Sequence, residues 1–223
     1  MKITNIISLV ILLLLTLLAG CEPQDDRTTP LPGEYYPMEE GVVKYYLREQ
    51  YMPDTKEIFF SDTIKIVFKG DTVINEKTFQ QFRFYSKWER ADHVIIETSD
   101  VYRIVKNTGS KYYFLPFSSD TTQYLFLDTQ ATLGAQWTYQ SGFEDAFKST
   151  YTVKAVDRKL KVNGVLYYHV VEVWKESYYK WQDEPYKLFN LEKKYYAPGA
   201  GEIFSQSEIY TYTSGLRITL LNL

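Results

Sequence analysis

The sequence predicts an all-β protein: a single antiparallel domain of about ten strands, arranged as a curved open sheet, a half-barrel or a sandwich. Apolar and polar residues alternate with a period of two through most of the chain after residue 39. Aromatic residues make up 17% of the sequence, with 21 Tyr and 13 Phe, and these types favour pleated, half-buried surfaces. No segment keeps a convincing helical period for more than about two turns.

The first half of the domain shows this alternation in residues 43–47 and again in 64–68. Lys69-Gly70-Asp71 then predicts a bend or bulge, and Asn75-Glu76-Lys77 predicts a turn. We expect the later strands of this half at residues 79–84, 94–97, 101–105, 111–115 and 123–127.

The second half repeats the pattern after residues 128–146, where we expect a short helix or a loop. Val162-Asn163-Gly164-Val165 contains an Asn-Gly turn, the strongest short signal for a hairpin. Pro198-Gly199-Ala200-Gly201 predicts a second turn between two strands. The strands themselves are expected at residues 151–155, 167–174, 188–197, 202–213 and 218–221.

The two halves also share a spacing that suggests internal duplication. Ile74-Asn75-x-x-x-Phe79-x-x-Phe82 aligns with Val162-Asn163-x-x-x-Tyr167-x-x-Val170. In each half an Asn turn divides a long hairpin. Because short spacings recur by chance in β proteins, coincidence is the alternative.

The N-terminal residues 1–20 have the three parts of a secretory signal peptide: the basic Lys2, an apolar run over residues 6–18, and the small residues Ala19 and Gly20. That run has 13 residues, fewer than the approximately 20 that span a bilayer core. An uncleaved anchor helix is the alternative.

Leu18-Ala19-Gly20-Cys21 resembles the lipobox of bacterial lipoproteins. The resemblance implies cleavage before Cys21, a thioether-linked diacylglycerol on its sulfur and an acyl group on its new amine. Two or more acyl chains hold a protein stably on a membrane, whereas one holds it marginally. The alternatives for Cys21, the only cysteine, are a free thiol or half of a disulfide.

Residues 21–38 predict a flexible tether, because prolines are frequent and apolar periodicity is almost absent, and the β domain is expected over 39–223. Glu22 resembles the second residue of lipoproteins sorted to the outer membrane. Asp25-Asp26 resembles an acidic signal that sends some lipoproteins to the cell surface, although an ordinary polar linker explains it equally well. The expected location is therefore the bacterial outer membrane, on its periplasmic face or at the cell surface.

Three loose segments resemble uncharacterised bacterial lipoproteins: residues 35–46, residues 126–137 and residues 194–203, the last containing Tyr196-Ala197-Pro198-Gly199-Ala200-Gly201. The fold of that family is similar to the open, curved antiparallel sheets of periplasmic lipoprotein carriers. The family implies no function, since a fold by itself does not fix one.

Composition and motifs argue against several kinds of chemistry. Removal of residues 1–20 leaves 223 − 20 = 203 residues with a formal charge of −4, without a basic block, which argues against nucleic acid as a partner. The two histidines, His93 and His169, belong to no zinc-binding spacing, and no nucleophile elbow, phosphate loop or calcium loop is present. We expect no enzyme activity, no cofactor and no metal.

One aromatic cluster is the candidate binding surface for an apolar ligand or a glycan: Tyr178, Tyr179, Trp181, Tyr195 and Tyr196. The leading hypothesis is a lipid-anchored envelope protein whose β domain binds or scaffolds an envelope protein or another ligand. The alternative is a carrier or binder of a lipid, an acylated protein or another apolar ligand. This alternative predicts a deep apolar cavity beside a lid near residues 128–146. A cryptic hydrolase is the third hypothesis.

Overall fold

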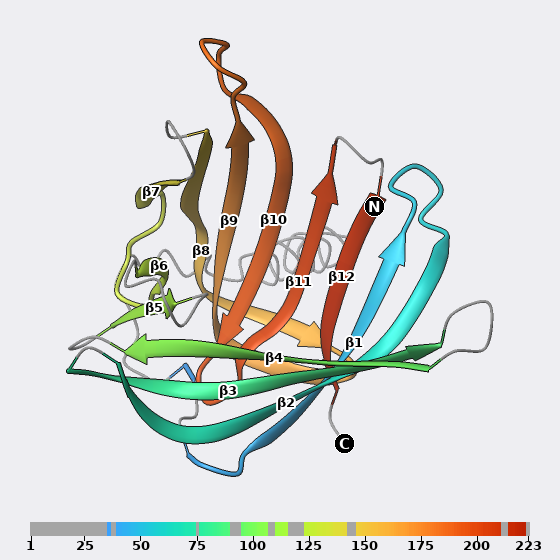
Figure 1. The fold of residues 1–223 in the computed structure, drawn as a ribbon, viewed down its shortest axis with the longest axis vertical. Helices are drawn as coiled ribbons and strands as arrows, with labels where there is room; N and C mark the ends of the chain where they lie inside the picture. Colours follow the sequence, from blue (N-terminus) through green and yellow to red (C-terminus); the bar gives the residue numbers. More distant parts are fainter. Residues whose placement is uncertain are drawn as a thin grey trace, which may run out of the picture.

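Twelve antiparallel strands form a single sheet in the computed structural model, which describes residues 35–36, 39–74, 76–89, 95–106, 110–115, 123–141, 146–210 and 214–221 (Figure 1). The strands are β1 (Val43–Tyr51), β2 (Ile58–Ile74), β3 (Lys77–Glu89), β4 (Ile95–Lys106), β5 (Lys111–Leu115), β6 (Tyr124–Asp128), β7 (Gln136–Ser141), β8 (Phe147–Val162), β9 (Val165–Tyr179), β10 (Lys187–Ala197), β11 (Gly201–Ile209) and β12 (Ser214–Leu221). The prediction of an all-β antiparallel domain is confirmed.

The strand order is β6-β5-β4-β3-β2-β1-β12-β11-β10-β9-β8-β7, so β1 and β12 pair in the middle of the sheet. Tyr46 lies opposite Leu220 at this central pairing. Each half of the chain is a six-stranded meander that runs from the centre to one edge. The result is the curved open sheet of the prediction, because the backbone ladder is not closed between β6 and β7 among the described residues.

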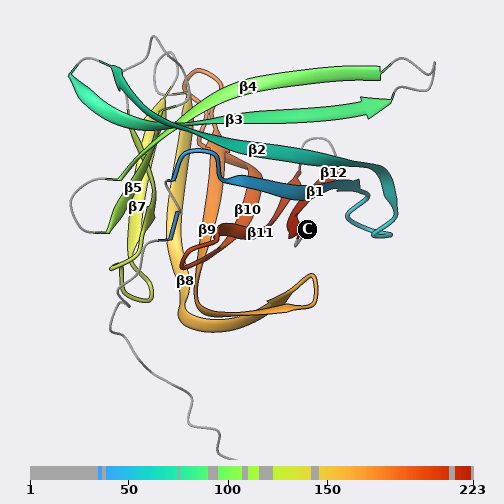
Figure 2. The ribbon, with the colours of Figure 1, turned by 90° about the horizontal axis from the view of Figure 1, so that it is seen from below.

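The sheet curves until its two edges lie close together. Figures 1 and 2 show β2, β3 and β4 crossing the direction of β8 to β11, so that the concave face lies between the halves. Trp137 Nε1 on β7 donates a hydrogen bond of 2.8 Å to the carbonyl of Leu125 on β6. The rings of Tyr124 and Tyr139 meet edge to face at 4.0 Å between centroids. Side chains therefore bridge the two edges where the backbone does not.

The turns follow the residues that predicted them. Asn163 and Gly164 have φ of 46° and 84°, the left-handed pair that a two-residue type I′ turn requires. Gly70 has φ of 81°, and the pairing of β2 with β3 shifts register between Phe68 and Asp71, which confirms the predicted bulge. Ala200 N donates to Ala197 O at 3.1 Å in the predicted turn between β10 and β11.

Two sequence predictions were wrong. Residues 128–146 contain strand β7 where a short helix or loop was expected, because six residues are too few for alternating Trp137 and Tyr139 to stand out. The strands expected at 94–97 and 101–105 are one continuous strand, β4. The described part of the chain contains no apolar helix of a length that could span a membrane.

The folded core begins before the predicted boundary at residue 39. Tyr35 is 1% exposed and belongs to the core together with Tyr112, Val173 and Tyr196. Its hydroxyl donates to the carbonyl of His169 at 2.7 Å. The core therefore takes in Tyr35 and its neighbour Tyr36, which the prediction had assigned to the tether.

The β8–β9 hairpin is sharply bent, and its turn end runs back across the fold (Figure 2). Asp157 and His169 both have φ of 56°, a backbone conformation that is rare for residues with a Cβ. Asp157 Oδ1 lies 2.5 Å from His169 Nδ1, which ties the two sides of the bend together. Beyond the bend, Val162 and Val170 pack in one cluster with Tyr46, so the hairpin covers one end of the concave face.

Candidate functional site

A cavity of about 640 Å³ lies on the concave face, and both halves of the sheet line it. This volume is within the range of roughly 300–1,000 Å³ that is typical of small-molecule sites. The lining side chains are Tyr36, Lys44, Tyr46, Ile64, Ile66, Phe68, Phe82, Phe84, Phe114, Tyr124, Phe126, Tyr139, Ser141, Phe147, Lys148, Ser149, Tyr151, Lys175, Ser177, Tyr178, Phe189, Glu192, Lys194, Tyr196, Glu202 and Ile218.

The wall from the first half of the chain is apolar. Ile64, Ile66 and Phe68 occupy alternate positions of β2 and therefore share one face of the sheet. Phe82 and Phe84 pair with Phe68 and Ile66 across the β2–β3 ladder, which extends the same face by one strand. We call these five side chains, together with Phe114 on β5 and Phe126 on β6, the phenylalanine wall.

Aromatic rings join the phenylalanine wall to the opposite side of the cavity. The Tyr36 ring lies 5.7 Å from Phe126 and 6.2 Å from Tyr196, measured between ring centroids. Gly201 leaves room for this ring, because a Cβ at that position would come within 2.9 Å of Tyr36 Cε1. Burial raises the pKa of both tyrosines well above the usual value of 10, so both stay neutral and act as apolar surface with one polar end.

The wall from the second half is charged. Lys194 Nζ on β10 lies 3.1 Å from a carboxylate oxygen of Glu192 and 3.1 Å from one of Glu202 on β11. Lys175 on β9 lies 3.7 Å from Glu192. We call Lys175, Glu192, Lys194 and Glu202 the charge cluster. The side chains of its two lysines and two glutamates are 19% to 29% exposed, and their charges cancel.

Electrostatic pairing outweighs burial within the charge cluster. Burial would raise the pKa of Glu192, but the adjacent Lys194 and Lys175 hold it below its usual value of 4.5. Burial would likewise lower the pKa of Lys194, yet Glu192 and Glu202 keep it well above 10.5. Glu192 and Lys194 therefore keep their charges at neutral pH, and the cluster is a polar surface inside a largely apolar cavity.

Lys44 lies apart from the charge cluster. Its side chain extends from β1 to the β10–β11 turn, where Nζ donates a hydrogen bond to the carbonyl of Ala200. The ammonium also lies 5.9 Å from the centroid of the Phe68 ring. No carboxylate within the described ranges forms an ion pair with it. Burial without an anion lowers its pKa from 10.5 to about 8.

Lys148, the fourth lysine of the lining, lies near the start of β10, whereas Lys44 contacts the β10–β11 turn at the end of that strand. The Nζ of Lys148 is 5.9 Å from the ring of Tyr178 and 5.7 Å from the ring of Tyr186. Lys148 pairs in register with Tyr178, which in turn pairs with Leu188 at the start of β10. The cavity therefore has a surplus of two positive charges, four lysines against two glutamates, at two separate places.

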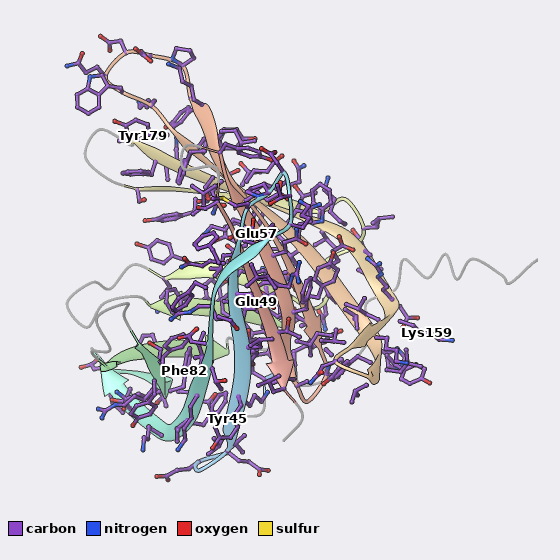
Figure 3. The ribbon with its side chains drawn as sticks, turned by 90° about the vertical axis from the view of Figure 1, so that its right-hand side faces the viewer. Tyr45, Glu49, Glu57, Phe82, Lys159 and Tyr179 are labelled. Atoms are coloured by element: carbon purple, nitrogen blue, oxygen red, sulfur yellow. The ribbon has the colours of Figure 1, made fainter. Side chains whose placement is uncertain are left out.

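The five predicted aromatic residues do not form one surface. Tyr196 is 1% exposed and faces the cavity, whereas the preceding Tyr195 hydrogen-bonds Glu172 on the convex face. Tyr178 lines the cavity. Tyr179 and the 63% exposed Trp181 lie 6.4 Å apart near the β9–β10 turn. In Figure 3, Tyr179 is well separated from Lys159 on the bent hairpin, and Phe82 lies toward the opposite end of the molecule.

The cysteine and the two histidines considered in the sequence analysis form no further site among the described residues. Cys21 and His93 lie outside the described residues. His169 is half exposed and pairs with Asp157 at the bend of the β8–β9 hairpin. Among the described residues, no group of three or more His, Cys, Asp or Glu side chains is placed to hold a metal ion.

Sequence reasoning missed Lys44 and the charge cluster. All of them sit on strands at positions where a charge normally indicates the solvent face, so alternation alone did not identify them as lining an interior cavity. Lys194 and Glu192 share a strand face with Tyr196, which the prediction had placed in the candidate aromatic binding surface. The spacing Glu192-x-Lys194-x-Tyr196 was the available signal, because residues two apart face the same side.

No model of a protein family matches the chain, and no curated protein matches it. One similar solved structure is a Bacteroides fragilis protein proposed to be exported, with a YmcC-like fold. It is 12% identical, with coverage of 85% of this chain and 98% of the other and a TM-score of 0.49. A Parabacteroides distasonis protein proposed to be a lipoprotein is 8% identical, with coverage of 84% and 97% and a TM-score of 0.45. At these identities the likeness says nothing about a ligand.

Proposed function

We propose that this chain is a lipid-anchored, non-enzymatic protein of the bacterial cell envelope whose β domain binds a molecule with a long apolar part. The ligand class is a lipid, the acyl part of an acylated protein, or a similar apolar molecule. This is the carrier hypothesis of the sequence analysis, with the cavity on the concave face as the proposed binding site.

The observation that carries the proposal is the cavity itself. A volume of about 640 Å³ remains between the phenylalanine wall and the charge cluster, on the concave face of a folded β domain. Protein interiors are normally packed to the density of organic crystals, so an apolar volume of this size is unusual unless something occupies it. Apolar contacts on one side and a few polar groups on the other are typical of ligand sites.

The anchor in this proposal rests on the N-terminal sequence. Lipidation at Cys21 would place the β domain beside a bilayer, where apolar ligands are concentrated. Glu22 favours the outer membrane, and the acidic pair Asp25-Asp26 resembles a signal for exposure at the cell surface. Mass spectrometry of the mature N-terminus tests the anchor, and a Cys21→Ser variant should leave the membrane fraction. An unmodified thiol at Cys21 would contradict this part of the proposal.

A photo-cross-linker inside the cavity tests the binding function in living cells. We would replace Phe84 of the full-length protein with p-benzoylphenylalanine, irradiate the cells and identify adducts by mass spectrometry. The expected product is an adduct with an alkyl-containing molecule. The matched control is the same replacement at Phe59, which lies on the same hairpin but is 52% exposed. Equal lipid adducts at both positions, or none at Phe84, would contradict binding in the cavity.

A further inference from the structure

The cavity differs from a plain apolar pocket because two of its four lysines, Lys44 and Lys148, form no ion pair with a carboxylate among the described residues. Lys175 and Lys194 are already neutralised by Glu192 and Glu202. Among the described residues, the ammonium of Lys44 contacts the carbonyl of Ala200 and lies 5.9 Å from the centroid of the Phe68 ring. Burying a charge without a counter-ion is costly, so an anion that entered the cavity would be stabilised there.

Lys44 also stands where the two walls meet. It pairs across the ladder with Ile66 of the phenylalanine wall and reaches the turn that precedes Glu202 of the charge cluster. An apolar chain lying along Phe68, Phe82 and Phe84 would therefore end at Lys44. This arrangement suits an amphipathic molecule with one anionic end.

We infer that the ligand of this cavity is an anionic amphiphile and that Lys44 pairs with its charged head while the phenylalanine wall covers its apolar body. The inference rests on the proposed function and adds the charge of the ligand and the residue that selects it. A carboxylate and a phosphate share the chemistry that Lys44 recognises, since both accept hydrogen bonds from an ammonium.

The neighbouring groups leave Lys44 as the titrating cation near pH 8. The titratable side chains that line the cavity around it are Tyr36 and Tyr46 from its own side and Lys194, Tyr196 and Glu202 from β10 and β11. Burial raises the pKa of the three tyrosines above 10, and the pKa of Lys194 is also raised. Glu202 is paired with Lys194. On the other side, β2 presents Ile66 and Phe68.

The test uses two probes that differ only in the head group. Full-length protein in phosphatidylcholine vesicles is labelled with photoactivatable hexadecanoic acid or with the corresponding hexadecanol. We expect wild type to prefer the acid by roughly ten- to a hundredfold, as for a charge-assisted hydrogen bond. Lys44→Met should lose this preference and still bind the alcohol. Lys193→Met, at a lysine of the convex face that does not line the cavity, should behave as wild type, and Lys148→Met is compared with Lys44→Met as the cavity's other unpaired lysine. Membrane partitioning of the probes cancels when variants are compared.

The pH profile separates recognition by Lys44 from a structural role. Above pH 8 the affinity for the acid should fall about tenfold per pH unit, because binding then requires uptake of a proton by Lys44, while alcohol binding stays constant. Lys44→Arg should keep the acid preference and lose this pH dependence, since arginine stays charged.

The possible outcomes distinguish failure of the anionic-ligand inference from failure of the proposed binding function. Equal binding of acid and alcohol by wild type would overturn the anionic ligand and leave the cavity function intact. A Lys44→Arg variant with the wild-type pH profile, or loss of the preference in Lys148→Met in place of Lys44→Met, would overturn the role of Lys44. Failure of wild type to bind either probe would contradict the proposed function as well. A phosphate-headed probe in place of the acid then distinguishes the two kinds of anion.

Discussion

The two halves of the chain share one architecture and differ in what they present to the cavity. Each is a six-stranded meander, and its longest strands form a hairpin: β2–β3, which ends with Ile74 paired to Lys77, and β8–β9, which has a two-residue turn at Asn163-Gly164. In each half the hairpin changes register before its turn, near Gly70 in the first and near Asp157 in the second. The inward side chains of the first half are mostly Phe and Ile, whereas those of the second include Lys and Glu.

This difference shows how one sheet makes an amphipathic cavity. A repeated meander supplies two curved walls of similar shape, and the residues at alternating positions decide what each wall contacts. The corresponding positions of the two long hairpins agree with internal duplication, which stays a prediction. The bends also differ: the first half uses glycine, while the second holds Asp157 and His169 in left-handed conformations through their mutual contact.

The largest expected effect comes from removing the central cation of the charged wall. Lys194→Met should destabilise the domain by about 2 kcal/mol, because Glu192 and Glu202 would remain partly buried without their shared partner. Urea unfolding measures this loss. The control is Lys193→Met on the convex face, where the lysine contacts the ring of Trp174 and a loss of under about 1 kcal/mol is expected. Equal losses would contradict the role of the cluster.

Truncating a side chain of the phenylalanine wall should reduce ligand affinity more than it reduces the stability of the domain. Phe84→Ala should weaken binding of hexadecanol about tenfold and destabilise the domain by about 1–2 kcal/mol. That cost is below the roughly 3–5 kcal/mol of a fully packed phenylalanine, because one side of the ring already borders the cavity. Calorimetric unfolding and probe labelling give the two quantities. Phe59→Ala, at an exposed ring, should change neither, and a larger stability loss for Phe84→Ala would indicate a filled core.

Lowering the pH should remove the stabilising contribution of Glu192 in the charge cluster. Because the folded-state pKa of Glu192 is below 4.5, its contribution to stability is present above pH 4.5 and disappears as the pH falls through the lower folded value. Glu192→Gln should therefore be less stable than wild type by about 1 kcal/mol at pH 7 and equally stable at low pH. Unfolding curves at pH 7, 4 and 3 measure the convergence. A difference that persists at pH 3 would contradict this linkage.

The smallest effect compares the two hairpin turns. Gly164 has φ of 84° and Glu76 has φ of 64°, so only the second half places glycine at this left-handed position. Gly164→Ala should destabilise the domain by about 1 kcal/mol, and Glu76→Gly should stabilise it by about 0.5 kcal/mol. Thermal unfolding of both variants would show shifts of opposite sign. Shifts of the same sign would show that the turns are not equivalent.

The sequence predicted local features well where a short signal carried them. The Asn163-Gly164 turn and the bulge at Gly70 follow from the φ angles that these residues permit, which neighbours hardly influence. The spacing Glu192-x-Lys194-x-Tyr196 places these charges on the face of an aromatic residue, but alternation identifies two faces of a strand without saying which one is enclosed, so their interior position could not be predicted. Strand β7 was missed because its partner lies on β8 and its edge contact on β6, both outside any short window.

The chain by itself determined the antiparallel β class and the positions of most turns, and it carries the lipobox-like Leu18-Ala19-Gly20-Cys21, since each depends on residues close together in the sequence. Only the tertiary structure decided that Tyr35 is part of the core and that Tyr195 and Tyr196 lie on opposite faces of the sheet. The same is true of the position of Lys44 beside the phenylalanine wall. These facts depend on how far a twelve-stranded sheet curves. Its curvature is set by many pairings at once, and no short stretch of sequence encodes it.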